Sequence, residues 1–212
     1  IGVRLVGSEM CIRDSIRGTL RAAAANVSSG GVSEGASTIN QQYVKNYLWL
    51  IEAENEEEAA QAIETSLPRK LREMKMAGDL DEKLTKDEIL TRYLNLVSFG
   101  NSAFGVQAAA QTYFGVSAEK LNDNQAAFLA GIVQSTSALN PYTNPEGAKQ
   151  RRNAVLQARV TAKTLSQTKA DEIANQPLGV LKKPRVPENG CIGAGGSGFF
   201  CDYVMASASY TH

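Results

Sequence analysis

A polar stripe is predicted along a helix that begins just after Gly35. Ser37 is a favourable N-cap residue, so we expect the helix to start there with its free backbone N–H groups exposed. Ser37, Gln41 and Lys45 recur every four residues and therefore share one face of this helix. A hydroxyl, an amide and a cation beside a helix N-terminus suit a phosphate or pyrophosphate that carries a sugar. A capped surface helix explains the same pattern, and the residues alone leave both interpretations open.

A second group of residues that could take part in a reaction consists of Arg69, Lys70 and Glu73. On a helix these three side chains lie within an arc of about 100°, while the apolar side is formed by Leu67, Leu71 and Met74. The two cations would stabilise the ionised carboxylate and could neutralise a pyrophosphate leaving group. Glu73 could also hold a divalent ion such as Mg²⁺ or Mn²⁺. A ladder of surface salt bridges is the alternative interpretation.

Both segments resemble signature motifs of the peptidoglycan glycosyltransferase domain found in class A penicillin-binding proteins and their monofunctional relatives. Arg69, Lys70 and Glu73 reproduce the family's third motif, which is Arg-Lys, two residues and Glu. The second motif is matched by Gly35, Ser37, Thr38, Ile39, Gln41, Gln42, Lys45 and Asn46.

The resemblance extends along about residues 16–156. Residues 89–100 are similar to the fourth motif, in which we expect Asn95 to be a buried, hydrogen-bonded amide. Residues 134–153 are similar to the fifth motif, in which the turn at Asn140 either borders the pocket or is a plain turn.

The resemblance implies a processive enzyme that polymerises the lipid-linked disaccharide lipid II into glycan strands and releases undecaprenyl pyrophosphate. The growing strand would be the donor and lipid II the acceptor, at the extracytoplasmic face of the cell membrane. Glu73 would be one of two active-site acids and would serve the pyrophosphate together with Lys45, Arg69 and Lys70. The substrate would be positioned by Ser37, Thr38, Gln41 and Gln42. A transpeptidase domain could follow in the full protein.

One element of the family pattern is missing. The first motif, a Glu-Asp pair followed by an aromatic residue and a histidine, supplies the principal acid and does not occur in this sequence. Residues 1–15 resemble a translated sequencing-adapter tail and are expected to be a non-native tail outside the folded domain. We therefore expect the catalytic base and the membrane anchor to lie upstream of residue 16, and this chain alone to be inactive.

Composition narrows the remaining classes of function. The 212 residues suffice for one domain with a sizeable core, and 22 basic against 22 acidic residues give no electrostatic case for a nucleic-acid partner. The single histidine, His212, is the last residue, which argues against a Ser-His-Asp triad. Between Glu52 and Leu67 there are six glutamates and no Lys or Arg. We interpret this segment, which is longer than the link common in the family, as a solvated helix face.

Helical periodicity dominates the chain and predicts an all-α fold. We expect one lysozyme-like helical domain over residues 16–176 and a Gly- and Pro-rich linker over residues 177–212. Pro68 should either kink a helix or begin a new one. Helices are predicted over residues 16–26, 37–50, 55–76, 85–97, 106–114, 122–133 and 144–164.

Cysteines of the predicted linker lie ten residues apart around a glycine-rich turn, at Cys191 and Cys201. They could form a disulfide or remain as two thiols. The extracytoplasmic location that the resemblance implies favours the disulfide.

Two other classes of function compete with the polymerase. A lytic glycosidase with a helical domain would also use carboxylates, although the cationic cluster of Lys45, Arg69 and Lys70 argues against it. A non-catalytic module that binds a lipid pyrophosphate is the other alternative, because the first-motif glutamate is absent.

Overall fold

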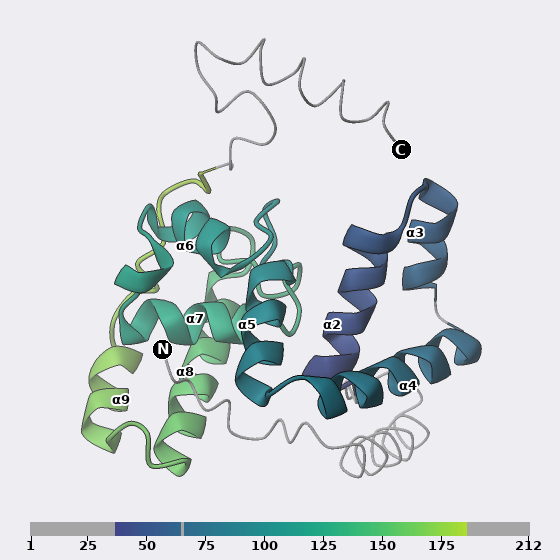
Figure 1. Cartoon of the computed structure of the whole chain (residues 1–212). Coiled ribbons are helices and arrows are strands. Elements are labelled where there is room, and N and C mark those ends of the chain that lie inside the picture. The colour runs from purple at the N-terminus through teal and green to yellow at the C-terminus, as the bar shows by residue number, and fades with distance from the viewer. Residues whose placement is uncertain (1–36, 65, 186–212) are drawn as a thin grey trace, which may run out of the picture.

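The fold is known from a computed structural model, which describes residues 37–64 and 66–185 (Figure 1). Within these ranges the regular elements are all helical, and the only β-type pairing is an isolated bridge between Ser98 and Phe104. The predicted all-α class is confirmed. The domain boundary expected at residue 16, the tail before it, Cys191 and Cys201 lie outside the described residues, so those predictions stay open.

The described helices follow one another with short connections. In chain order they are α2 (Ile39–Tyr47), the π-helix η1 (Leu48–Glu52), α3 (Glu56–Ile63), α4 (Leu67–Lys83), α5 (Lys86–Leu96), α6 (Val106–Phe114), the 3₁₀ helix η2 (Ala118–Lys120), α7 (Asp123–Ile132), α8 (Pro145–Thr161) and α9 (Gln167–Ala174).

Local capping signals explain most helix boundaries. Thr85 caps α5 in a capping box with Glu88, as the sequence predicts. Pro68 lies in the first turn of α4, where its missing N–H costs nothing, so it begins a helix and does not kink one. Gly115 ends α6 in the left-handed conformation, with φ of 70°.

Both predicted boundaries of α2 are wrong. The N-cap of α2 is Thr38, whose Oγ1 accepts a hydrogen bond from the backbone N–H of Gln41, and not Ser37. The helix expected over residues 37–50 ends as an α-helix at Tyr47 and continues as the wider π-helix η1. Over residues 55–76 the sequence left open a kinked helix or a second helix beginning at Pro68, and the structure has two helices, α3 and α4. Helix α9 was not predicted.

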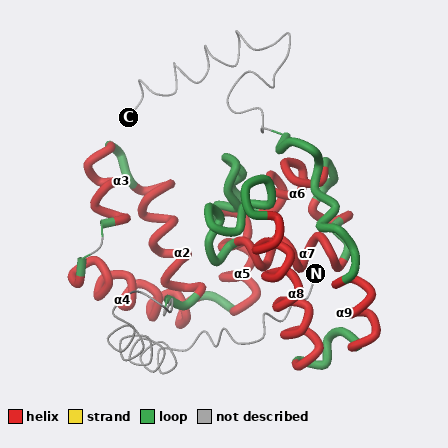
Figure 2. The backbone as a smooth tube through the Cα atoms, turned by 180° about the vertical axis from the view of Figure 1, so that it is seen from behind, coloured by secondary structure: helices red, strands yellow, loops and turns green. Residues whose placement is uncertain are grey.

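The helices form two neighbouring groups, which Figure 1 and the reverse view in Figure 2 both show. In one group α2 packs against α4 and also contacts η1 and α3, which follow it in the chain. In the other group α7 packs against α8, and α8 packs against α9. Helix α2 also packs against α5 and so joins the two groups. The main core lies mostly in the second group, where it includes the buried rings of Phe99, Tyr113 and Phe128, and it extends to Ile39 and Tyr43 of α2. None of the described helices is both long enough and apolar enough to cross a bilayer.

Helix α4 turns its Glu73 face inward. Leu67 and Leu71 are 74% and 59% exposed, whereas Glu73 is 1% exposed and Ala77 is buried. The face that contacts α2 is therefore the one that carries Glu73, and Leu67 and Leu71 of the apolar side face outward. A spacing pattern identifies the two faces of a helix, but the partner helix decides which of them is covered.

Candidate active site

A buried carboxylate on α4 is the centre of the candidate site. Glu73 Oε1 accepts a hydrogen bond from Arg69 Nη1, and Glu73 Oε2 accepts one from Lys70 Nζ at 3.1 Å. The helical spacings i, i+4 and i, i+3 bring the three groups onto one face. Only 2% of the Glu73 side chain is exposed, whereas Arg69 and Lys70 keep 18% and 26%. The carboxylate is thus covered by two cations that still reach solvent.

The beginning of α2 meets this cluster through Ser37. Lys70 Nζ donates to Ser37 Oγ at 2.5 Å, across 33 positions of sequence. Lys70 therefore bridges a hydroxyl beside the N-terminus of α2 and a carboxylate on α4. The structure brings together Ser37, Arg69, Lys70 and Glu73, which we call the Glu73 cluster. This arrangement places two cations beside the positive end of a helix, where an anionic group is stabilised.

Gln42 has a structural role that its sequence motif does not reveal. Its Oε1 accepts from Tyr93 Oη at 3.1 Å, and its Nε2 donates to the carbonyl of Ser37 at 3.1 Å. Burial raises the pKa of Tyr93 to about 12, which keeps its hydroxyl protonated and able to donate. Gln42 thereby ties α2 to α5 and holds the backbone at Ser37, so it acts here as a positioning residue.

The remaining residues of the predicted stripe are placed differently. Gln41 is buried within α2, and Thr38 caps that helix. Lys45 is half-buried and makes no ion pair or hydrogen bond through its side chain with any described residue. The structure therefore leaves Lys45 outside the Glu73 cluster, two turns further along α2. Its proposed contact with pyrophosphate stays a prediction.

Sequence reasoning missed two supporting contacts of the site. Asn40 is buried, and its Nδ2 donates to Asp81 Oδ1 at 3.1 Å, which joins α2 to the later part of α4. Tyr93 holds Gln42 from 51 positions away. No local pattern announces such pairs, because they depend on how α2 lies against α4 and α5.

The fourth and fifth motifs form scaffold beside the main core. Tyr113 Oη donates to the carbonyl of Phe99 at 2.7 Å and accepts from Asn101 Nδ2 at 3.0 Å. Asn140 Nδ2 lies 3.5 Å from Asn101 Oδ1, so the two motif segments touch through these amides. Asn95, predicted to be a buried amide, is exposed and donates to the carbonyl of Thr91 on its own helix. The reason is that the opposite face of α5, with Ile89 and Tyr93, meets the core.

Glu73 has few neighbouring acidic groups that could help it to bind a divalent ion. Both carboxylate oxygens already accept from cations, and the described residues contain no group of three or more His, Cys, Asp or Glu side chains that could hold a metal. A hard divalent ion prefers several oxygen ligands. The metal stays a sequence prediction.

The all-α fold and a glutamate held by an Arg-Lys pair agree with one protein family. The chain belongs to the Transglycosylase family, whose model matches residues 15–160. The family suggested by the second and third motifs is confirmed.

Several curated proteins share this domain. The chain is 32% identical over 173 residues to penicillin-binding protein 1A of Pseudomonas aeruginosa, an alignment that covers 82% of this chain and 20% of that protein. It is 37% identical over 161 residues to penicillin-binding protein 1A of Neisseria gonorrhoeae, covering 76% of this chain and 19% of that one. With penicillin-binding protein 2D of Bacillus subtilis it shares 38% identity over 157 residues, covering 74% and 21%.

A solved structure also matches. The crystal structure of penicillin-binding protein 1A from Haemophilus influenzae aligns with a TM-score of 0.43 and 27% identity, covering 68% of this chain and 17% of that one. The chain spans about a fifth of the length of the curated relatives that it matches.

Proposed function

We propose that the chain is part of a peptidoglycan glycosyltransferase that polymerises lipid II into glycan strands and releases undecaprenyl pyrophosphate. The observation that carries this proposal is the Glu73 cluster in a chain of the Transglycosylase family. Its two cations are partly exposed and adjacent to the start of α2, as a diphosphate leaving group requires.

The chemistry is a displacement with inversion at the sugar carbon that bears the pyrophosphate. An acceptor hydroxyl loses its proton to a base and forms the new C–O bond, while the old C–O bond breaks and its electron pair leaves on the pyrophosphate. Arg69 and Lys70 are proposed to neutralise the leaving diphosphate, with Ser37 fixing the direction of the Lys70 ammonium. Glu73 holds both cations in place until the diphosphate competes for them.

Glu73 is not proposed as the base that activates the acceptor. Arg69 contacts one of its oxygens and Lys70 the other, so both oxygens are already occupied by cations and neither is free to face an acceptor hydroxyl. The base belongs to the Glu-Asp-aromatic-His motif, which this sequence does not contain. We therefore propose that these 212 residues alone bind the lipid pyrophosphate but do not polymerise it.

A membrane surface is the proposed setting. Large apolar side chains are exposed along η1, α3 and the first half of α4, namely Ile51, Ile63, Leu67 and Leu71. Exposed apolar residues of this kind on neighbouring elements suit the boundary of a lipid layer, where the lipid carrier resides. By analogy with penicillin-binding proteins, we place this surface at the extracytoplasmic face of the cell membrane, with a transpeptidase domain as a further part of the full protein.

The test is polymerisation of lipid II by the chain joined to its first-motif segment. Glycan strands resolved on a gel should form with the completed protein and not with these 212 residues alone. Lys70→Ala should lower the rate about 10² to 10³-fold, as for loss of one charge-stabilising donor. Glu119→Gln, a change of an exposed carboxylate on η2, is the matched control. Cleavage of preformed glycan in place of synthesis would instead identify a lytic glycosidase.

A further inference from the structure

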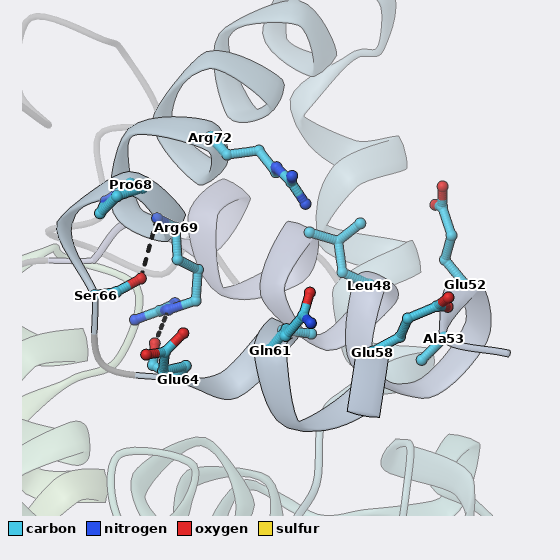
Figure 3. Close-up of a pocket in the computed structure, with 11 residues that line it drawn as sticks. Leu48, Glu52, Ala53, Glu58, Gln61, Glu64, Ser66, Pro68, Arg69 and Arg72 are labelled. Atoms are coloured by element: carbon cyan, nitrogen blue, oxygen red, sulfur yellow. Dashed lines mark hydrogen bonds between the residues drawn. The ribbon is translucent and has the colours of Figure 1, made fainter. Parts of the chain in front are cut away.

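A cavity of about 530 Å³ lies between the acidic segment and the beginning of α4 (Figure 3). Its walls come from both ends of η1, from α3 and from the first turns of α4. Arg69 is the only member of the Glu73 cluster that lines it. Its volume falls in the range of ordinary ligand pockets. Helix α3 belongs to the acidic segment that departs from the family pattern, so this cavity is not explained by the shared motifs.

Charged groups of both signs face this cavity. Figure 3 shows Arg72 extending into it from α4, with Glu64 at one end and Glu52 and Glu58 at the other. Two of its charged side chains are already engaged. Arg69 donates to Glu73 and to the carbonyl of Glu64, and Glu58 accepts from the backbone N–H of Glu54 and from Asn55 at the start of α3.

The other charged side chains of the cavity are available to a ligand. Arg72, Glu52 and Glu64 form no side-chain hydrogen bond or ion pair with any residue in the described part of the chain. One available cation therefore faces two available carboxylates. This balance is unfavourable for a diphosphate, which would meet more negative than positive charge. It is favourable for a ligand that carries a carboxylate and one or more ammonium groups.

We propose that this cavity binds a short amphoteric peptide, with the peptide carboxylate on Arg72 and its ammonium groups on Glu64 and Glu52. The amide of Gln61 in the cavity wall can bond to the peptide backbone, and Leu48 offers an apolar contact for a small side chain. We infer that the peptide is the one attached to the glycan substrate. This part of the proposal rests on the proposed function.

Arg69 connects the cavity with the candidate active site. This side chain forms part of the cavity wall and also contacts Glu73 in the candidate active site. A peptide in the cavity would therefore lie directly beside the groups proposed to hold the pyrophosphate of the same substrate. Peptide binding would then contribute to positioning the substrate, which truncated substrates without the peptide would lose.

The first experiment is an NMR titration of the ¹⁵N-labelled chain with the tripeptide lysyl-alanyl-alanine. We expect binding with a dissociation constant of about 1 mM, with shift changes confined to η1, α3 and the first turns of α4. Acetylation of both amines, or conversion of the carboxylate to an amide, should each weaken binding about three- to tenfold. Inorganic pyrophosphate should not displace the peptide. Shift changes elsewhere, equal affinity for the blocked peptides, or displacement by pyrophosphate would each overturn the proposal.

Charge-neutral variants show which group recognises which end. Glu64→Gln should reduce the preference for free over acetylated peptide, and Arg72→Gln the preference for acid over amide. A merely structural role would weaken all the peptides alike, which would count against the proposal. Glu119→Gln and Lys120→Gln, on the distant η2, are controls that should bind as the unchanged chain does.

One further comparison tests whether the peptide comes from the glycan substrate. The same tripeptide joined through its N-terminal amine to a muramic acid sugar keeps the lysine ammonium and the carboxylate, so it should bind more tightly than the doubly acetylated tripeptide. A linked peptide that binds no better than the doubly acetylated one would contradict the assignment to the glycan substrate. These measurements need no polymerisation. A completed protein that makes glycan but shows no peptide binding would remove this inference and leave the proposed function intact.

Discussion

The ammonium of Lys70 on α4 donates a hydrogen bond to the hydroxyl of Ser37, 33 positions earlier in the chain. This contact joins the second and third sequence motifs into one site. It also places a cation that is shared with a buried carboxylate at the start of α2. The proposed chemistry rests on this relationship, because a diphosphate would compete with Ser37 and Glu73 for the Lys70 ammonium.

The pairing of Arg69 with Glu73 predicts a measurable coupling. Arg69→Ala leaves a carboxylate that is 1% exposed with Lys70 as its remaining cation, so the free energy of unfolding should fall by about 1 to 3 kcal/mol. Glu73→Gln combined with Arg69→Ala should recover part of this loss. A double-mutant cycle by urea denaturation measures the coupling, and strictly additive changes would show that the pair is not coupled.

Arg152 is predicted to be a stability residue at a distance from the cluster. Its guanidinium is fully buried and donates to the carbonyls of Ala174 and Gln176 and to Asn124 Oδ1. Burial lowers its pKa, but the group stays protonated at neutral pH. Arg152→Leu would leave these acceptors unpaired at the end of α9, which should cost about 2 to 4 kcal/mol.

Urea denaturation at neutral pH tests the role of Arg152. The control is Arg159→Leu, on the same helix as Arg152, which removes an exposed ion pair with Asp123 of α7. Its free energy of unfolding should change by less than about 1 kcal/mol. Equal effects of the two changes would contradict the role assigned to Arg152.

The hydrogen bond between Tyr93 and Gln42 predicts that the protein loses stability at alkaline pH. Burial raises the pKa of Tyr93 to about 12, above its value of about 10 in an unfolded chain. A group whose pKa is raised on folding stabilises the protein below the unfolded value, and this contribution is lost as pH rises from about 10 through 12. Tyr93→Phe should be less stable at pH 7 because Gln42 Oε1 loses its donor.

The difference between Tyr93→Phe and the unchanged chain is the informative quantity, because lysines titrate in the same range. This difference in the free energy of unfolding should shrink between about pH 10 and 12. Equilibrium unfolding of both proteins at each pH measures it. A difference that stays constant across this range would show that the Tyr93 hydroxyl is not buried as described.

Two glycines with similar backbone angles give a test of local packing. Gly105 has φ of +82°, and a Cβ there would lie 2.6 Å from the carbonyl oxygen of Asn95. Gly179 has φ of +73°, but a Cβ there meets no atom within 4 Å. Gly179→Ala should cost about 1 to 2 kcal/mol from backbone strain alone, and Gly105→Ala clearly more. Thermal unfolding of both variants compares them, and equal losses would contradict the close approach at Gly105.

The parts of the fold that sequence analysis predicted are those set by local signals. Thr85 with Glu88 and Gly115 each mark a helix end through contacts within a few residues, and each was identified correctly. For Pro68 the sequence left a kink or a new helix open, and the structure shows the new helix. Ser37 and Thr38 are both competent caps, so local signals do not choose between them; in the structure Thr38 caps the helix and the Ser37 hydroxyl accepts from Lys70.

The parts that sequence analysis missed depend on distant partners. The outward position of Leu67 and Leu71 follows from α2 covering the Glu73 face of α4, which no property of α4 alone determines. The third motif correctly placed Arg69, Lys70 and Glu73 together, because helical spacing alone achieves this. The tie between Gln42 and Tyr93 and the separation of Lys45 from the cluster could not be read from spacing.

The most direct test of the Glu73 cluster is calorimetric binding of farnesyl pyrophosphate, a short lipid diphosphate, to the 212-residue chain. The account predicts binding that Lys70→Ala weakens about tenfold or more, that Lys120→Ala leaves unchanged, and that Glu73→Gln strengthens, because Glu73 competes with the diphosphate for Arg69 and Lys70. Binding that is equal in the unchanged chain and in Lys70→Ala, or weaker in Glu73→Gln, would contradict it.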